Sequence, residues 1–134
     1  MDTTTVALDT GAAPAVVDLT PQVRRFCAER GDGLCHVFAP HATAGLALVE
    51  LGAGTEQDLL TALDSLLPRD DRWVHAHGSP GHGADHVLPV LVSPSLSLPV
   101  QGGRPDLGTW QSVALVDTNR DNASRQVRLS FLAG

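Results

Sequence analysis

Four of the chain's six histidines lie in one segment, WVHAHGSPGHGADH, which spans residues 73–86. They are His75, His77, His82 and His86. Zinc and similar ions favour neutral imidazole, and catalytic zinc sites typically use three protein ligands and one open position. Gly and Pro interrupt the segment, which predicts a loop over roughly residues 74–85. Because these spacings match no zinc signature, a solvated polar loop is the alternative interpretation.

Four further residues carry groups suited to the same chemistry. His41 lies in APHATAGLALVE between two predicted strands, where it could bind a metal or bond a backbone carbonyl. Glu50 ends that apolar run, where a solvated strand end is the alternative, and Asp58 lies in the first turn of a helix, where the helix dipole alone explains it. Alternation along the last strand places Arg125 on the same face as Val127. One inward Arg could bind a phosphate in bidentate fashion, and a solvated surface position is the alternative.

The segment LGTWQ is unusual for a core strand. Trp110 and Gln111 both carry hydrogen-bonding groups that need partners if they are buried. A tryptophan at such a position is more often a core residue than a platform for a ligand. Cys27 and Cys35 form neither a disulfide framework nor a C-x-x-C pair, so they are interpreted as small buried hydrophobic residues.

The helices that must position these groups have clear boundaries. Thr20 can cap a first helix with Pro21 at its first position, and Gly31 can end it. Thr55 can cap the clearest helix, whose apolar stripe is made of leucines and which Pro68 follows. A short helix is predicted at 86–92.

Strand patterns fill most of the remaining chain. They are residues 3–10, 34–39, 42–51, 96–100, 109–117 and the closing strand 125–134. The last two are joined by a hairpin loop, NRDNAS. This order predicts a compact α+β fold with largely antiparallel, sandwich-like sheets packed with two main helices, in a single domain spanning 1–134.

Composition excludes some classes of partner. The chain of 134 residues has a formal net charge of −6 and no basic stripe, which argues against nucleic acid and against anionic membranes. The N-terminus has neither the basic start nor the apolar run of a signal peptide. No apolar stretch approaches the ~18 residues of a membrane span. Cytoplasmic location is therefore the expectation.

Several motifs in this order resemble the YjbQ-like family, small proteins often labelled secondary thiamine-phosphate synthase enzymes. The motifs are PHATAGLALVE, the helix with Asp58, WVH at 73–75, HVLPVLVSPSLSLPVQGGRPDLGTWQSVALVD and the RQVR strand. The resemblance runs from about Val16 to Gly134. It implies an α+β homotrimer, a histidine-lined pocket with a divalent metal (Zn²⁺, or else Mg²⁺) near the subunit boundaries, and a small phosphorylated metabolite. It also implies weak synthesis of thiamine phosphate from a pyrimidine diphosphate and a thiazole phosphate.

The resemblance also assigns roles by position. It implies His41, His75 and His86 as metal ligands, with His77 and His82 as companions. It implies catalytic roles for Glu50, Asp58, Gln111 and Arg125, and contacts to a bound cofactor for Thr43 and Trp110. The chain departs from the family's usual pattern at Val49, at Ser79–Pro80–Gly81 and at Ala84. Three alternatives stay open: a phosphate-ester hydrolase built from the same parts, a non-catalytic metal- and anion-binding module, and a structural domain with an incidental histidine loop.

Overall fold

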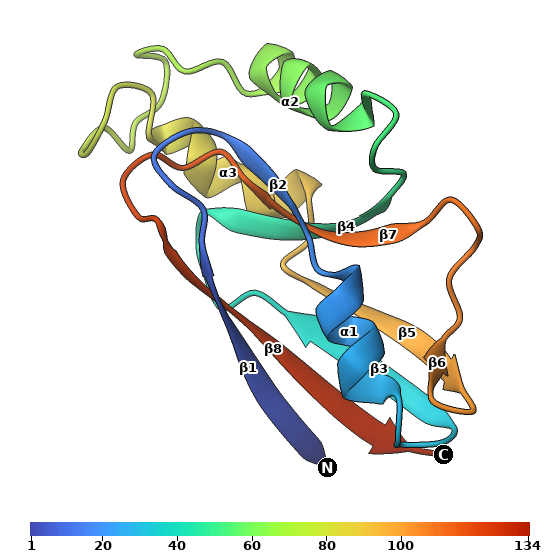
Figure 1. The fold of residues 1–134 in the computed structure, drawn as a ribbon. Coiled ribbons are helices and arrows are strands. Elements are labelled where there is room, and N and C mark those ends of the chain that lie inside the picture. The colour runs from blue at the N-terminus through green and yellow to red at the C-terminus, as the bar shows by residue number, and fades with distance from the viewer.

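The computed structural model describes residues 1–134, which form eight strands and three helices (Figure 1). The strands are β1 (Asp2–Asp9), β2 (Ala15–Asp18), β3 (Gly33–Phe38), β4 (Ala44–Val49), β5 (Ser95–Gln101), β6 (Arg104–Pro105), β7 (Ser112–Asp117) and β8 (Ser124–Ala133). The helices are α1 (Thr20–Cys27), α2 (Thr55–Leu66) and α3 (Gly83–Leu91). None of these helices has the length and apolar character needed to cross a membrane.

The strands form two antiparallel sheets, which confirms the predicted fold class. The five-stranded sheet has the order β1-β8-β3-β5-β6, and the three-stranded sheet has the order β2-β7-β4. Figure 1 shows α2 and α3 on the far side of the small sheet from the large one. The layers are therefore large sheet, core, small sheet and a helical layer, with α1 packed into the core beside the sheets.

Alternation along β7 explains how this strand serves two cores. Val113 and Leu115 are fully buried and belong to the main core between the sheets. Val116 points to the opposite face, as successive strand residues must, and packs with Leu63 of α2 and Leu88 of α3 in a second core. The small sheet thus fixes α3 against a scaffold that is buried on both faces.

A close approach between β4 and the end of α3 depends on one glycine. A Cβ added to Gly45 would lie 2.0 Å from the carbonyl oxygen of Val92, which no side chain tolerates. Next to it, the backbone N–H of Leu46 donates to the carbonyl of Ser93 at 2.8 Å. The early Gly in this strand therefore lets the chain after α3 lie directly on β4.

Both predicted threonine caps are wrong. The N-cap of α1 is Leu19 and that of α2 is Gly54, and neither helix has a side-chain cap hydrogen bond. Thr20 is buried instead, and its hydroxyl accepts a hydrogen bond from the backbone N–H of Val113 at 2.9 Å. The Thr20 hydroxyl therefore bonds a buried strand amide instead of capping the helix. An unpaired buried N–H would cost more free energy than a missing cap.

Other boundaries also differ from the sequence prediction, and two of these differences determine where candidate site residues lie. The third helix begins at Gly83 rather than at His86, so the end of the histidine segment is helical. Strand β7 begins at Ser112 rather than at residue 109, which leaves Trp110 and Gln111 in the preceding turn. The backbone N–H of Gln111 bonds the carbonyl of Gly108, and this tight turn ends the strand pattern early.

The two cysteines are buried and unpaired, as predicted. Burial raises the pKa of the Cys35 thiol to about 12, with the neighbouring Cys27 adding to the shift. Since the thiolate is the reactive form, Cys35 is a packing residue of the core.

Candidate metal centre

Three histidines bring their ring nitrogens together at the start of α3. One ring nitrogen from each of His75, His82 and His86 lies within 4.8 Å of the other two. The two Nε2 atoms of His82 and His86 are 2.9 Å apart. In a tetrahedral zinc site with bonds of about 2.0–2.1 Å, two ligand nitrogens lie roughly 3.3 Å apart. The cluster therefore has the spacing of a three-histidine site for one divalent ion.

Helix α3 and one close contact set this arrangement. His82 is the N-cap residue of α3, and His86 lies one turn later, so both side chains lie on the same face. His75 arrives from the preceding segment, which passes against the start of the helix. A Cβ added to Gly83 would lie 2.5 Å from the carbonyl of His75 and 2.4 Å from Cβ of Trp73. Glycine at this position therefore allows the two parts of the segment to meet.

Two carboxylates lie behind His82, on the opposite ring edge from the cluster. Nδ1 of His82 is 2.7 Å from Oδ2 of Asp121 and 3.7 Å from Oδ2 of Asp85. Neither contact is aligned as a hydrogen bond, so Nδ1 of His82 and Oδ2 of Asp85 are buried polar atoms without a bonded partner. A carboxylate at Nδ1 favours the proton on that nitrogen, which leaves the Nε2 lone pair free for a metal.

A polar network ties this part of the chain to the end of β7. The Arg69 guanidinium donates to Oδ1 of Asp85 and to the Ser79 hydroxyl, and the Thr118 hydroxyl donates to Asp85 at 2.9 Å. The Ser79 hydroxyl and backbone N–H both donate to Asp121. The backbone N–H of Ser79 is the main cause that lowers the pKa of Asp121, followed by the Ser79 hydroxyl and the charges of His82 and Arg69. The segment before α3 is therefore held to the β7–β8 connection.

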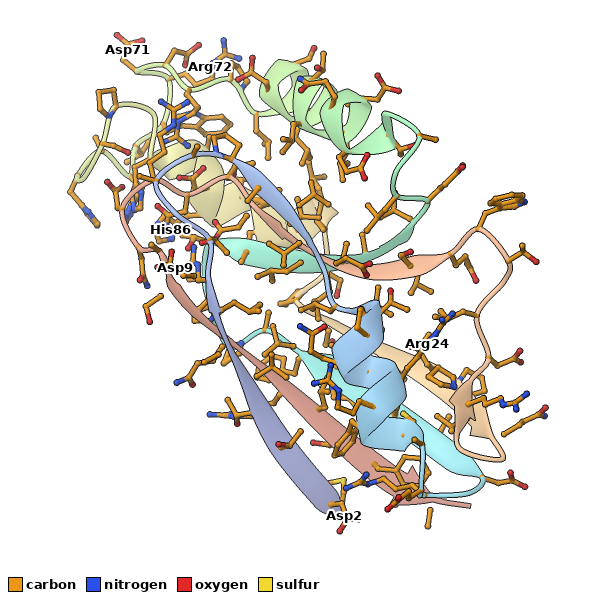
Figure 2. The ribbon with its side chains drawn as sticks, viewed as in Figure 1. Asp2, Asp9, Arg24, Asp71, Arg72 and His86 are labelled. Carbon is orange, nitrogen blue, oxygen red and sulfur yellow. The ribbon has the colours of Figure 1, made fainter.

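The protonation state of the cluster suits a metal. Desolvation lowers the pKa of His75 and of His86, and the neighbouring histidines lower both further. Imidazole must be neutral to bind a metal, so these shifts keep the ligands ready at neutral pH. Three converging ring nitrogens, with a carboxylate behind one of them, fit a divalent ion. Figure 2 shows His86 at the same end of the molecule as Asp9, far from Asp2.

His41 lies outside this group. Its Nε2 accepts a hydrogen bond from the backbone N–H of Gln126 at 2.9 Å and is 3.1 Å from the carbonyl oxygen of that residue. Strand β3 ends at Phe38, which pairs with Arg128, so the next free backbone groups of β8 are those of Gln126. The His41 side chain thus bonds the backbone of β8 where β3 no longer pairs with it. This agrees with the alternative interpretation in which His41 bonds a backbone group. Its role as a metal ligand stays a prediction.

Arg125 points inward, as its alternation with Val127 predicted, but it does not face a cavity. Its guanidinium makes two hydrogen bonds to Asp117, at 2.7 and 3.1 Å, and both residues are almost completely buried. It also donates to the hydroxyl of Thr43 at 2.8 Å, which accepts a second hydrogen bond from Asn119. Protein groups therefore bond both side chains, and the roles of Arg125 toward phosphate and of Thr43 toward a cofactor stay predictions.

The remaining predicted site residues lie away from the cluster. Trp110 and Gln111 precede β7, whereas the histidine segment is bonded to residues that follow it. Six strand residues rise roughly 20 Å, so the length of β7 separates the two groups. Trp110 is 74% exposed, and Gln111 Oε1 accepts from the N–H of Gly108. Glu50 follows the strand end that pairs beside Ser112, and Asp58 is exposed on α2.

The surroundings of His41 predict how its contribution to stability depends on pH. Desolvation, followed by the charge of Arg125, lowers the pKa of His41 below its usual value of about 6.5. As pH falls below about 6.5, the unfolded chain gains this proton before the folded chain does, so the stability that neutral His41 contributes is lost. We expect histidine ring NMR in the presence of a chelator to give a midpoint below 6.5 for His41, with the signal assigned from His41→Gln. A midpoint at or above 6.5 would contradict the assigned environment.

The sequence left the role of His82 open and gave no sign of the Asp121 carboxylate behind it. The spacing of His82 and His86 is i, i+4, which places both on one helix face. That signal was hidden because the glycines predicted a loop through residue 85. The contribution of Asp121 had no local signal, because it lies in a distant hairpin, whereas Asp85 follows His82 at i, i+3.

The chain is similar to known proteins both in sequence and in fold. The sequence profile of the family described as UPF0047 protein YjbQ-like matches residues 4–134. The UPF0047 protein Rv2556c of Mycobacterium tuberculosis is 60% identical over 134 residues, covering 100% of both chains. A crystal structure of a hypothetical protein from Aeropyrum pernix K1 has a TM-score of 0.89 at 28% identity, covering 100% of both chains. A YbjQ-like protein of unknown function from Sulfolobus solfataricus P2 shares the fold, with a TM-score of 0.92 at 23% identity over 99% of this chain and 97% of that one.

Proposed function

The chain belongs to the UPF0047 family of YjbQ-like proteins, and from its histidine cluster we propose that it is a metal-dependent enzyme acting on a small phosphorylated metabolite. The observation that carries the proposal is the convergence of three imidazole nitrogens within 4.8 Å, with a carboxylate behind one of them. His75, His82 and His86 would hold the ion. His82 replaces His41 in the ligand set that the resemblance implied.

The donor atoms favour zinc over magnesium. Magnesium binds oxygen ligands and keeps several waters, whereas imidazole nitrogen suits zinc and its neighbours among the transition metals. A bound divalent ion would supply Lewis-acid stabilisation of charge on a phosphoryl oxygen. Asp121 would hold the proton at Nδ1 of His82 and so keep that ring oriented.

A cavity of about 420 Å³ adjoins the cluster and would receive the substrate. Its walls include Trp73, His75 and His82, together with two carboxylates, Asp70 and Asp71, and no Lys or Arg. An anionic substrate would therefore depend on the charge of the ion for binding. His77, whose ring centroid lies 4.1 Å from that of His75, is the exposed group available to move a proton.

Two reactions use these parts, and product analysis separates them. The family resemblance favours the coupling of a pyrimidine diphosphate with a thiazole phosphate to give thiamine phosphate, with release of pyrophosphate. The hydrolysis of a phosphate ester needs the same ion and the same cavity. We expect zinc-loaded protein to turn over one substrate class and chelated protein to turn over neither. Tight binding of the substrates without product would support the non-catalytic module instead.

The homotrimer implied by the resemblance is part of this proposal. Trp110 is 74% exposed, and Val90 and Leu91 at the end of α3 are 80% and 54% exposed. Such apolar groups commonly mark protein contacts. In a trimer, residues such as Trp110 and Gln111 of one protomer could approach the cluster of another, which would reconcile their separation within one chain with the roles that the resemblance gives them.

The carboxylate behind His82 makes a prediction of its own. Asp121→Asn is expected to weaken zinc binding by about 10–100-fold, because the partner that fixes the ligand's tautomer and orientation is lost. Competition with a chromophoric chelator measures this affinity. Asp106→Asn, an exposed carboxylate outside the cluster, is the matched control and should bind zinc like the wild type. Equal affinity in the two variants would remove Asp121 from the site.

A further inference from the structure

A second cavity lies beneath α2 and shares no lining residue with the cavity at the histidines. Its volume is about 380 Å³, within the range of roughly 300–1,000 Å³ that small-molecule pockets occupy. Helix α2 forms one wall, and the start of α3 with the residues after β7 forms the other. Asp85 and Arg69 line it from the network behind His82, but the three clustered histidines do not reach it.

The α2 wall presents three leucines beside the polar residues Gln57, Thr61 and Asp64. Leu60, Leu63 and Leu67 lie at helical spacing and turn toward the cavity, and Leu63 and Leu67 are buried. Pro14, from the β1–β2 connection, adds a further apolar group. This wall would cover the hydrocarbon part of a bound molecule.

The cavity is lined by two arginines and two aspartates, but only one arginine and one aspartate form an ion pair. Arg69 and Asp85 are bonded to each other and so compensate one another. Asp64 on α2 and Arg120 after β7 also line the cavity, and both are exposed. No ion pair joins Asp64 to Arg120 or joins either of them to another residue. One carboxylate and one guanidinium from different walls are thus left to face the contents of the cavity.

We propose that this cavity binds a small zwitterion with an apolar body, of the chemical class of a free apolar amino acid. The anionic group would pair with Arg120, the cationic group with Asp64, and the apolar body would lie on Leu60, Leu63 and Leu67. A ligand with an anionic group alone would leave Asp64 unpaired beside it, and one with a cationic group alone would do the same to Arg120. The unpaired opposite charges therefore select for a molecule that carries both.

Three probes that differ by one charged group test the proposal. Phenylalanine carries both charges, 3-phenylpropanoate only the anion, and 2-phenylethylamine only the cation. Each is titrated into the full chain in the presence of a chelator, and leucine methyl signals are followed by NMR. We expect saturable phenylalanine binding that shifts the methyl signals of Leu60, Leu63 and Leu67. We expect each single-charge probe to bind about tenfold more weakly.

Two surface variants assign the charges. Arg120→Gln should weaken binding of phenylalanine and 3-phenylpropanoate but not of 2-phenylethylamine, and Asp64→Asn should weaken phenylalanine and 2-phenylethylamine only. Both residues are exposed, so both variants should fold. Arg24→Gln, on exposed α1 surface, is the control (Figure 2). The proposal is overturned by no saturable methyl shift, by equal binding of the three probes, or by variants that match the control. Because the ion is chelated throughout, these outcomes are independent of the proposed metal function.

Discussion

Replacing Arg125 with Ala is expected to lower the free energy of unfolding by about 3–5 kcal/mol, a large fraction of the roughly 5–15 kcal/mol of a typical domain. Arg125 and Asp117 are 2% and 0% exposed, and the guanidinium occupies both carboxylate oxygens. Removing the guanidinium leaves a buried carboxylate whose main charged partner is gone. Thr10 and the N–H of Asn119 still donate to Asp117, but neutral donors do not compensate its charge.

Arg128 provides the matched control for this measurement. It lies three residues along the same strand and is exposed, so Arg128→Ala should change stability little, within about 0.5 kcal/mol. Urea denaturation at one fixed protein concentration compares the two variants and the wild type. A double variant, Arg125→Met with Asp117→Leu, should recover part of the loss because no unpaired charge remains. If Arg125→Ala were as stable as Arg128→Ala but inactive, Arg125 would be a functional residue, as the resemblance implied.

The fold was largely predictable because β-strand periodicity survives in this sequence. Alternation assigned the inward face of β8 correctly, including a buried arginine, because the period of two is fixed by backbone geometry. Helix starts were less predictable. Thr20 looks like a cap in the local sequence, but a strand amide 93 positions away claims its hydroxyl. Local capping preferences amount to only about 1 kcal/mol, so tertiary demands override them easily.

The candidate site was only half predictable, for a related reason. His75 and His86 were expected to meet, and they do. His82 was not expected beside them, because its place in the cluster depends on a helix that begins three residues earlier than predicted. His41 has a strand-end position that suits a ligand, but the unpaired backbone of Gln126 competes for its Nε2. Competition for backbone partners is a tertiary property that no local pattern contains.

The segment Ser79–Pro80–Gly81, where the chain departs from the family pattern, contacts the surroundings of His82. Ser79 donates to Asp121 through its N–H and its hydroxyl, and Asp121 lies behind Nδ1 of His82. Gly81 has φ of +77°, and a Cβ there would lie 2.4 Å from Cα of Arg69. The segment Ser79–Pro80–Gly81 therefore helps to hold Asp121 behind His82. We infer that this segment and His82 form one local unit.

Replacing His86 with Ala is expected to abolish zinc binding at micromolar concentrations, with a loss greater than the roughly 10–100-fold typical of an outer partner. His86 supplies one of the three donors, and its Nε2 faces that of His82 at 2.9 Å. Elemental analysis of untagged protein should give about one zinc per chain in the wild type, as three histidine donors around one ion require. Zinc at 100 times its Kd should also stabilise the wild type by about 2.7 kcal/mol and leave His86→Ala unchanged.

Three comparisons make this result specific. His36→Ala removes an exposed histidine bonded to Ser97 on the large sheet and should keep zinc. The melting temperature of His86→Ala in chelator should match that of the chelated wild type, which shows that the fold survives. His41→Ala decides how the centre is built. Retained zinc would mean that His41 is not a required ligand, in keeping with the hydrogen bond that its Nε2 accepts from Gln126. Lost zinc would mean that His41 completes the site, and the centre would then need a rearranged or neighbouring protomer. A wild type that binds no zinc would remove the metal-dependent function altogether.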